Sequence, residues 1–208
     1  MKSLPVIKLL LVMVLSTGLA AEGKWSSNFG LMSEYHFRGV AQTTDASAYG
    51  GVDYENGGWY AGSWAADVND GLEVDLYFGH NWQLDKVELS LGATSYQYSG
   101  DFDSEYNEVN LGFGFQSFKL DAAVGTRSED LGLAIPEQDY TFLLATYTVD
   151  AFSIKLGNWS GDIEGSYLEL GYGFTIGEFD TGIALIVSNS DLDDDETLVF
   201  QIGKSFDL

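Results

Sequence analysis

The sequence predicts an all-β fold, a single antiparallel transmembrane β-barrel of about 12 strands with both termini on the periplasmic side. Its last twelve residues, 197–208, alternate apolar and polar side chains with the period of a strand and end on the apolar Leu208. Eleven further segments also read as strands, which gives the even total typical of bacterial single-chain barrels. The connections alternate between tight turns and longer acidic loops, as they do in outer-membrane barrels.

Residues 1–21 have the features of a secretory signal peptide. Lys2 and Lys8 precede an apolar run at 9–15, and small residues follow the run. Cleavage is therefore expected after Ala20 or Ala21. The apolar run is far shorter than the roughly 20 residues of a membrane-spanning helix. We therefore expect residues 22–208 to form the barrel, located in the bacterial outer membrane.

The composition is strongly acidic and free of cysteine. Cleavage of the signal peptide leaves 7 Lys and Arg against 32 Asp and Glu, a net charge of −25. Nucleic acid is excluded as a partner by this charge, and thiol catalysis and cysteine-based zinc sites are excluded by the lack of cysteine. The 25 glycines and 30 aromatic residues (5 Trp, 12 Tyr, 13 Phe) suit strands joined by tight turns.

Period-two alternation places the strands along the chain. The first, 25–38, has Trp25, Phe29, Leu31, Tyr35 and Phe37 on the apolar face. The clearest alternation runs from 72 to 84, whereas 140–149 is apolar on both faces and leaves its register open. The remaining strands are expected at 46–55, 59–68, 86–96, 105–116, 119–127, 152–158, 167–176, 179–188 and 197–208.

The connections fall into two sets. Tight turns are expected at 56–58, 84–86, 117–118, 149–151 and 176–178. The other set is long and acidic, with 69–71 its shortest member, and comprises 39–45, 97–104, 128–139, 159–166 and 189–196. In outer-membrane barrels the short turns are periplasmic and the long loops extracellular, which puts both termini in the periplasm.

A soluble barrel of the lipocalin type is the alternative explanation of this alternation. Its polar face should be rich in solvating Lys and Glu, yet the polar face here carries many Gly, Ser, Asn and Tyr residues. A narrow polar lumen accounts better for that composition.

One segment, 33–42, carries a recognisable signature. It reads Ser-Glu-Tyr-His-Phe-Arg-Gly-Val-Ala-Gln and resembles the Ser-x-Tyr-x-Phe-Arg-Gly-x-Ser-Gln signature of the Gcw_chp family of uncharacterised Gram-negative outer-membrane proteins. The matching residues are Ser33, Tyr35, Phe37, Arg38, Gly39 and Gln42, and Ala41 replaces the usual serine. Segments 51–54 and 59–65 also resemble that family. The resemblance implies an outer-membrane barrel and brings no established activity or ligand.

Charged side chains on the polar face are the candidates for a functional lumen. The expected lumen residues are Glu34, His36, Arg38, Asp67, Glu73, Asp75, Glu88, Glu108, Asp121 and Glu169. Glu34, His36 and Arg38 are placed on the first strand, either as a charged constriction or, as we favour, as a structural plug of ion pairs. Acids outnumber bases on this face, so any current should be carried by cations.

No residue pattern indicates catalysis, a metal centre or a cofactor. His36 and His80 are the only histidines and lie on opposite faces, and His80 next to Trp82 fits an interfacial aromatic girdle. The acidic segment 191–196 begins like a calcium loop but lacks the glycine and glutamate that such a loop needs. A solvated acidic loop is the better interpretation.

Three functions follow from these observations. The first is a narrow porin-like channel for small cationic solutes, and the second a non-conducting structural or surface-interaction barrel. The third and most remote is an outer-membrane lipid-modifying enzyme, which His36 would have to serve. Expected partners are outer-membrane lipids and lipopolysaccharide, small solutes or cations, and the barrel-assembly machinery, which would engage the last strand through Phe206 and Leu208.

Overall fold

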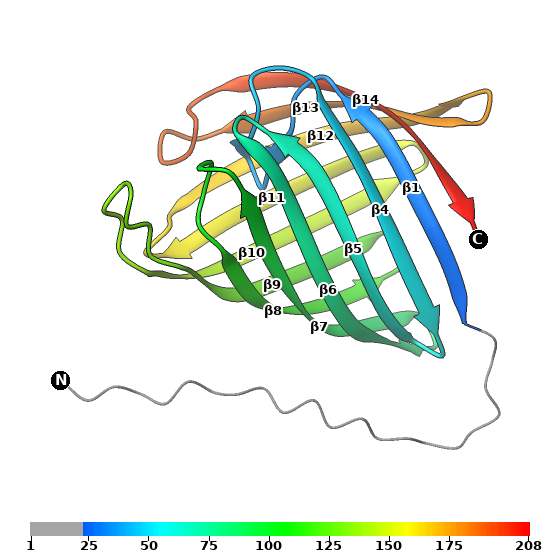
Figure 1. Cartoon of the computed structure of the whole chain (residues 1–208). Helices are drawn as coiled ribbons and strands as arrows, with labels where there is room; N and C mark the ends of the chain where they lie inside the picture. The colour runs from blue at the N-terminus through cyan, green and yellow to red at the C-terminus, as the bar shows by residue number, and fades with distance from the viewer. Residues whose placement is uncertain (1–22) are drawn as a thin grey trace, which may run out of the picture.

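The computed structural model describes residues 23–208 and consists of a closed β-barrel with a small hairpin inside it (Figure 1). The predicted signal peptide lies outside the described residues. The twelve barrel strands are β1 (Lys24–Met32), β4 (Ser47–Asn56), β5 (Trp59–Val68), β6 (Gly71–Leu84), β7 (Val87–Ser99), β8 (Tyr106–Phe115), β9 (Phe118–Arg127), β10 (Gln138–Val149), β11 (Phe152–Gly161), β12 (Gly165–Ile176), β13 (Phe179–Ser188) and β14 (Glu196–Asp207). The hairpin consists of β2 (His36–Phe37) and β3 (Val40–Ala41). Residues 23–208 contain no helix that is long and apolar enough to cross a bilayer.

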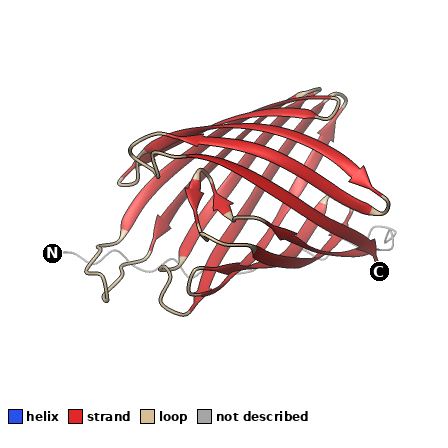
Figure 2. Cartoon of the chain, turned by 90° about the horizontal axis from the view of Figure 1, so that it is seen from above, coloured by secondary structure: helices blue, strands red, loops and turns tan. Residues whose placement is uncertain are grey.

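Every barrel strand pairs with its neighbours in antiparallel fashion, and the first pairs with the last. Figure 2 shows the strands in red and the loops and turns that join them in tan. Gly30 of β1 lies opposite Gly203 of β14, and the amide of Leu208 donates to the carbonyl of Trp25 at 2.9 Å. No strand edge is left unpaired around the barrel, as a bilayer requires of backbone hydrogen-bonding groups. The predicted twelve-strand antiparallel barrel is confirmed.

The outer face of the barrel is apolar around its middle. Leucines at outward-facing positions of several strands are about half exposed, including Leu31, Leu76, Leu111, Leu143 and Leu156. The same observation shows which face of β10 points inward, because Leu143 is exposed outside whereas Tyr140 and Phe142 are buried inside. Apolar residues outside and polar residues inside are the arrangement of a membrane barrel, the reverse of a soluble ligand-binding barrel.

Aromatic residues surround the barrel close to the short turns. Trp59 follows one turn and Trp82 precedes the next, and the ring of His80 lies between them, 4.7 and 4.5 Å from their ring centroids. Exposed aromatic residues flank the other turns as well, at Phe115, Phe118, Phe152 and Phe179, and Phe206 lies near the end of the last strand. Such a ring of aromatic side chains is typical of the level where a barrel meets lipid headgroups.

The two ends of the barrel differ in their connections. At one end, here called the turn end, the strands are joined by two-residue turns at 57–58, 85–86, 116–117, 150–151 and 177–178. At the opposite loop end the connections are 33–46, 69–70, 100–105, 128–137, 162–164 and 189–195. The long loop predicted at 159–166 is wrong, because β11 continues to Gly161 and β12 already begins at Gly165.

The first predicted strand is also wrong in its second half. β1 ends at Met32, and after Ser33 the chain turns into the barrel instead of continuing along the wall. Tyr35 and Phe37, expected on the lipid face, therefore lie inside. The infolded segment 33–46 is called the plug below. It leaves the wall because its polar groups find buried partners in the lumen, which the next subsection describes.

Candidate functional site

The plug is built on a tight β-hairpin whose turn is Arg38-Gly39. His36 pairs with Ala41 and Phe37 with Val40, and the two turn residues have φ angles of 49° and 87°. Positive φ at both central residues is the signature of a type I′ turn. Glycine is also needed at 39 because a Cβ there would lie 2.7 Å from the ring of Tyr167. The turn thus carries an arginine side chain into the centre of the lumen.

Arg38 forms a two-pronged ion pair with Glu108 of β8. Nη1 donates to Oε2 at 2.9 Å and Nη2 to Oε1 at 2.6 Å, and the Glu108 side chain is completely buried. The hydroxyls of Tyr96 and Tyr140 and the amide of Asn110 also donate to this carboxylate, at 2.9, 2.8 and 2.7 Å. A buried charge is tolerated only when its hydrogen-bonding capacity is filled in this way.

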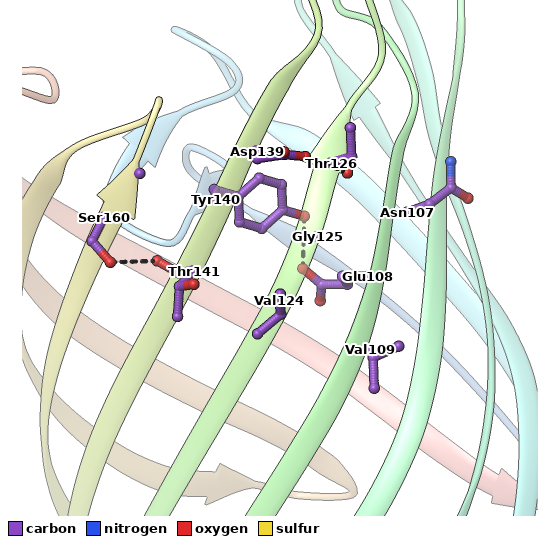
Figure 3. Close-up of a pocket in the computed structure, with 11 residues that line it drawn as sticks. Asn107, Glu108, Val109, Val124, Gly125, Thr126, Asp139, Tyr140, Thr141 and Ser160 are labelled. Atoms are coloured by element: carbon purple, nitrogen blue, oxygen red, sulfur yellow. Dashed lines mark hydrogen bonds between the residues drawn. The ribbon is translucent and has the colours of Figure 1, made fainter. Parts of the chain in front are cut away.

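Tyr140 reaches Glu108 across an intervening strand. Tyr140 lies on β10 and Glu108 on β8, and both are paired with Gly125 of β9. Figure 3 shows the Tyr140 hydroxyl directed over Gly125 toward the Glu108 carboxylate. A Cβ at position 125 would lie 2.7 Å from that hydroxyl, so the absence of a side chain on β9 makes the contact possible.

A second buried carboxylate, that of Glu73 on β6, holds the start of the plug. The Tyr35 hydroxyl donates to Oε1 at 2.5 Å and the Tyr98 hydroxyl to Oε2 at 2.8 Å. Burial and the neighbouring Glu73 carboxylate raise the pKa of Tyr35, so this phenol remains a donor. Each end of the plug hairpin is therefore fixed by an acid that projects from the wall.

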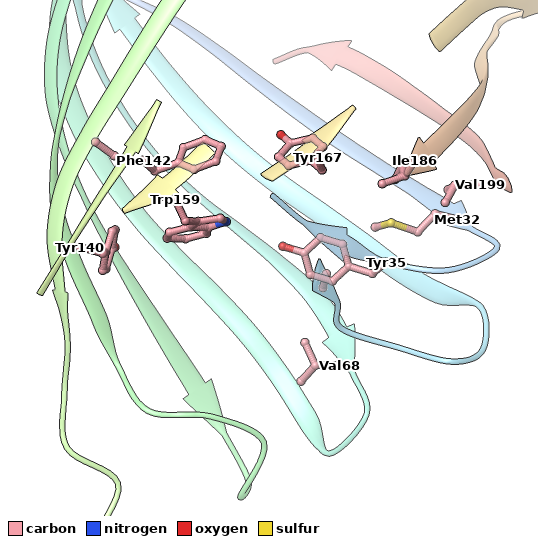
Figure 4. Packing of buried hydrophobic residues seen from close by; sticks show 11 residues of the cluster. Met32, Tyr35, Val68, Tyr140, Phe142, Trp159, Tyr167, Ile186 and Val199 are labelled. Carbon is pink, nitrogen blue, oxygen red and sulfur yellow. The ribbon is translucent and has the colours of Figure 1, made fainter. Parts of the chain in front are cut away.

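Aromatic side chains fill the space between the plug and the wall (Figure 4). The Arg38 guanidinium lies 4.4 Å from the ring centroid of Phe142 and 5.3 Å from that of Trp159. Tyr35 packs edge-on against Trp64 with centroids 5.5 Å apart, and Phe37 against Tyr96 at 5.1 Å. The loop-end half of the lumen is consequently a packed core.

The plug is also bonded to strands far along the chain. The indole nitrogen of Trp159 donates to the Arg38 carbonyl at 3.1 Å, and the Ser188 hydroxyl donates to the Gly39 carbonyl. The Ala41 amide donates to the carboxylate of Asp193. Asp193 belongs to the acidic segment 191–196, so one acid of that loop has a structural task, and residues 23–208 contain no cluster of metal-ligating side chains.

The turn-end half of the lumen contains two cavities below the plug. The Lys155 cavity has a volume of about 520 Å³ and is lined by Glu34 and His36 of the plug and by Lys155 and Glu169 of the wall. The Lys119 cavity has a volume of about 510 Å³, and Arg38 lies on its plug side. The remaining charged residues that line the Lys119 cavity are Asp53, Glu55, Glu88, Lys119 and Asp121.

The structure redistributes the charged residues predicted for the lumen. Glu34, His36 and Arg38 lie on the plug and not on the first strand, and Glu34 Oε1 lies within hydrogen-bonding distance of His36 Nε2, at 2.8 Å. The prediction that Asp67 faces the lumen is wrong. Asp67 lies at an outward-facing position of β5, where its carboxylate accepts a hydrogen bond from the Ala48 amide. The other predicted positions face inward, namely Glu73, Asp75, Glu88, Glu108, Asp121 and Glu169.

Sequence reasoning missed the aromatic half of the site. Phe142 lies in the segment whose register the sequence leaves open, and Trp159 lies in the predicted loop 159–166. Nothing in the alternation of 167–176 indicates that Tyr167 packs against an inserted segment. The residues of the signature segment each acquire a structural role here. Ser33 bonds to the backbone of Phe200, Gln42 is buried against the Tyr35 carbonyl, and Arg38-Gly39 form the turn.

The match to a family model covers residues 18–200 and is to a bacterial protein family of unknown function, Gcw_chp. The chain belongs to the Gcw_chp family. The signature residues of this member are those of the plug. No curated protein matches the chain.

Several solved structures are similar to this chain at low sequence identity. One, from a study titled "Unveiling the Mechanism Behind the in-meso Crystallization of Membrane Proteins", is 12% identical with a TM-score of 0.65, covering 89% of this chain and 84% of that one. OccAB3 of Acinetobacter baumannii is 10% identical with a TM-score of 0.44, covering 86% of this chain and 60% of that one. The outer membrane protein opdK of Pseudomonas aeruginosa is 13% identical with a TM-score of 0.40, covering 80% of this chain and 59% of that one.

Proposed function

We propose that this Gcw_chp protein is an outer-membrane barrel of porin type that the plug holds closed, and that small cations pass only when the plug is displaced. The observation that carries the proposal is the plug itself. It occupies the loop-end half of the lumen and is bonded to β6, β8, β11 and β13. A narrow, permanently open channel does not fit that packing.

The charge of the lower lumen supports a preference for cations. Glu34, Asp53, Glu55, Glu88, Asp121 and Glu169 line the two cavities, against Arg38, Lys119 and Lys155. Arg38 is neutralised by Glu108, and both lysines are paired with neighbouring acids. An excess of fixed negative charge raises the local cation concentration and repels anions.

Planar-bilayer recordings of full-length protein test the closed state. Met32 lies opposite Ser47, so a linker of about four Gly and Ser residues can replace 34–45 without straining the wall. We expect little conductance from the unaltered protein and a cation-selective conductance from the linker variant. Changing Glu88 and Asp121 to Gln in that variant should reduce the selectivity.

The control is the same replacement of residues 129–136, a loop whose Leu131 is 84% exposed. This variant should stay closed, since its loop does not enter the lumen. Equal conductance of the unaltered and plug-less proteins would remove the closed-barrel proposal. A folded plug-less barrel that does not conduct would favour the structural, non-conducting barrel instead.

Assembly into the outer membrane, with the turns and termini in the periplasm, is part of the same proposal. β14 closes the barrel on β1 and exposes Phe206 and Leu208 outward, where lipid or the assembly machinery would contact them. Changing both to Asp should reduce the level of heat-modifiable protein in outer-membrane fractions, because a charge on the lipid face is destabilising. Ser205→Asp is the matched control, since Ser205 has the inward parity. Normal assembly of the double variant would contradict this role of the strand.

A further inference from the structure

The Lys155 cavity has the form of a binding site, which goes beyond the proposed conduction and does not require it. It is enclosed by the plug on one side and by β4, β5 and β11–β14 around it. Its volume of about 520 Å³ lies within the range of roughly 300–1,000 Å³ that is usual for small-molecule pockets.

Part of the space exists because Gly173 has no side chain, whereas a Cβ at Gly171 or Gly182 would lie 2.5 or 2.9 Å from the side chains of Ser153 and Gln201. Gly171, Gly173 and Gly182 are neighbours on β12 and β13 and line the cavity. A Cβ at Gly173 would meet no atom within 4 Å, so the volume next to it is open. The same inward parity at the loop end carries Tyr167, which fills its part of the lumen.

Charges of both signs face this space with unused hydrogen-bonding capacity. Lys155 Nζ donates to Glu169 Oε1 at 2.8 Å, its only hydrogen bond among the described residues. Two of its three N–H groups and the second oxygen of Glu169 remain available. His36 is nearly buried, with 5% of its side chain exposed, and its Nδ1 has no partner in residues 23–208, while Nε2 is bound to Glu34.

The cavity also has aromatic residues in its lining. Trp64 and Tyr49 line the cavity, their ring centroids 5.8 Å apart, and Tyr35 of the plug fixes Trp64 from the side. An ammonium group near such rings is favoured by their negative faces, in addition to the carboxylates.

We propose that the Lys155 cavity binds a small zwitterion that carries one ammonium and one carboxylate, of the size of a free amino acid. A carboxylate alone would meet Glu34 and Glu169, and an ammonium alone would meet Lys155. In a molecule with both charges, the carboxylate can bind Lys155 and the ammonium can bind between the acids and the aromatic residues, so charges of both signs are paired.

Isothermal titration of the full-length, unaltered protein in detergent tests the proposal with three probes. They are L-alanine, which carries both charges, L-alaninamide, which carries only the ammonium, and N-acetyl-L-alanine, which carries only the carboxylate. L-Alanine should bind about tenfold or more tightly than either analogue, since each analogue leaves charged hydrogen-bonding groups unpaired.

Two variants locate the site. Lys155→Met should weaken alanine binding by about tenfold or more, and Gly173→Phe should abolish it by filling the open volume. Lys119→Met is the matched control, because Lys119 forms the equivalent pair with Asp121 in the other cavity. It should leave binding unchanged. Absence of alanine binding, equal binding of an analogue, or unchanged affinity in Lys155→Met would overturn the proposal, and none of these results bears on whether plug removal opens the barrel.

Discussion

The two halves of this lumen are built on the same inward-facing parity of the same strands, yet one is packed and the other hollow. At the loop end the ion pair Arg38–Glu108 leaves 15% and 0% of its side chains exposed and is surrounded by rings. At the turn end the ion pair Lys155–Glu169 leaves 36% and 17% exposed and borders a cavity. The difference comes from the inserted plug and from where tyrosine and glycine stand on the wall.

The contrast shows how a barrel interior can hold charge in two ways. The Lys155 side chain is 36% exposed, so little desolvation is required and the pair contributes little. Arg38 and Glu108 have lost their water and depend on each other and on three further donors to the carboxylate. Removing one member of such a buried pair leaves the other without compensation.

The largest effect should separate the two ion pairs directly. Arg38→Met should lower the free energy of unfolding by about 3–5 kcal/mol because Glu108 is left buried and unpaired. Lys155→Met should change it by no more than about 1 kcal/mol. Urea unfolding in lipid vesicles, followed by tryptophan fluorescence, measures both. The double variant Arg38→Met with Glu108→Leu should recover part of the lost free energy of unfolding, because it leaves no unpaired charge. Equal losses in the two single variants would contradict the difference between the two halves of the lumen.

A smaller effect should come from adding one methyl group at each end. Gly157 lies beneath Tyr167 at the loop end, where a Cβ would lie 2.0 Å from the ring, whereas Gly173 faces open space. Gly157→Ala should cost about 1–3 kcal/mol through overpacking, and Gly173→Ala about 0.5 kcal/mol or less. Urea unfolding in lipid vesicles measures both variants. A loss of stability in Gly173→Ala as large as that in Gly157→Ala would mean that the turn-end half is not hollow.

The smallest effect concerns a single hydrogen bond to the plug. Trp159→Phe keeps an aromatic ring beside Arg38 but removes the indole donor to its carbonyl, so stability should fall by about 1–2 kcal/mol. Trp82→Phe, on the outer face, serves as the control for the loss of an indole and should change stability less. Conductance of the Trp159 variant should remain low, since the ion pair still holds the plug.

The barrel could be predicted from the sequence because its strands obey one rule. Residues such as Leu72 to Leu84 alternate strictly, and short turns separate successive strands. The number of strands therefore follows from local patterns, as do the faces of most of them, whereas 140–149, which is apolar on both faces, left its register open. The sequence predicts that Glu34, His36 and Arg38 fill the lumen with ion pairs. It does not predict that the backbone of this plug leaves the wall, since 33–38 continues the same alternation as β1. What decides its path is the set of contacts to Glu73, Glu108 and Trp159, which lie far away in the sequence. The prediction for Asp67 was wrong because polar residues occur on both faces near the end of a strand.

The spacing of the plug's contacts along the chain sets an order for folding. Tyr35 bonds to a residue 38 positions away, Arg38 to one 70 positions away, the Arg38 carbonyl to one 121 away and the Gly39 carbonyl to one 149 away. Each bond needs further strands in place, and the last needs nearly the whole barrel. Loop-closure entropy makes such distant contacts form late. A chain that stalls before β13 therefore has a partly anchored plug, because the bond from the Ser188 hydroxyl to the Gly39 carbonyl forms only when β13 is in place.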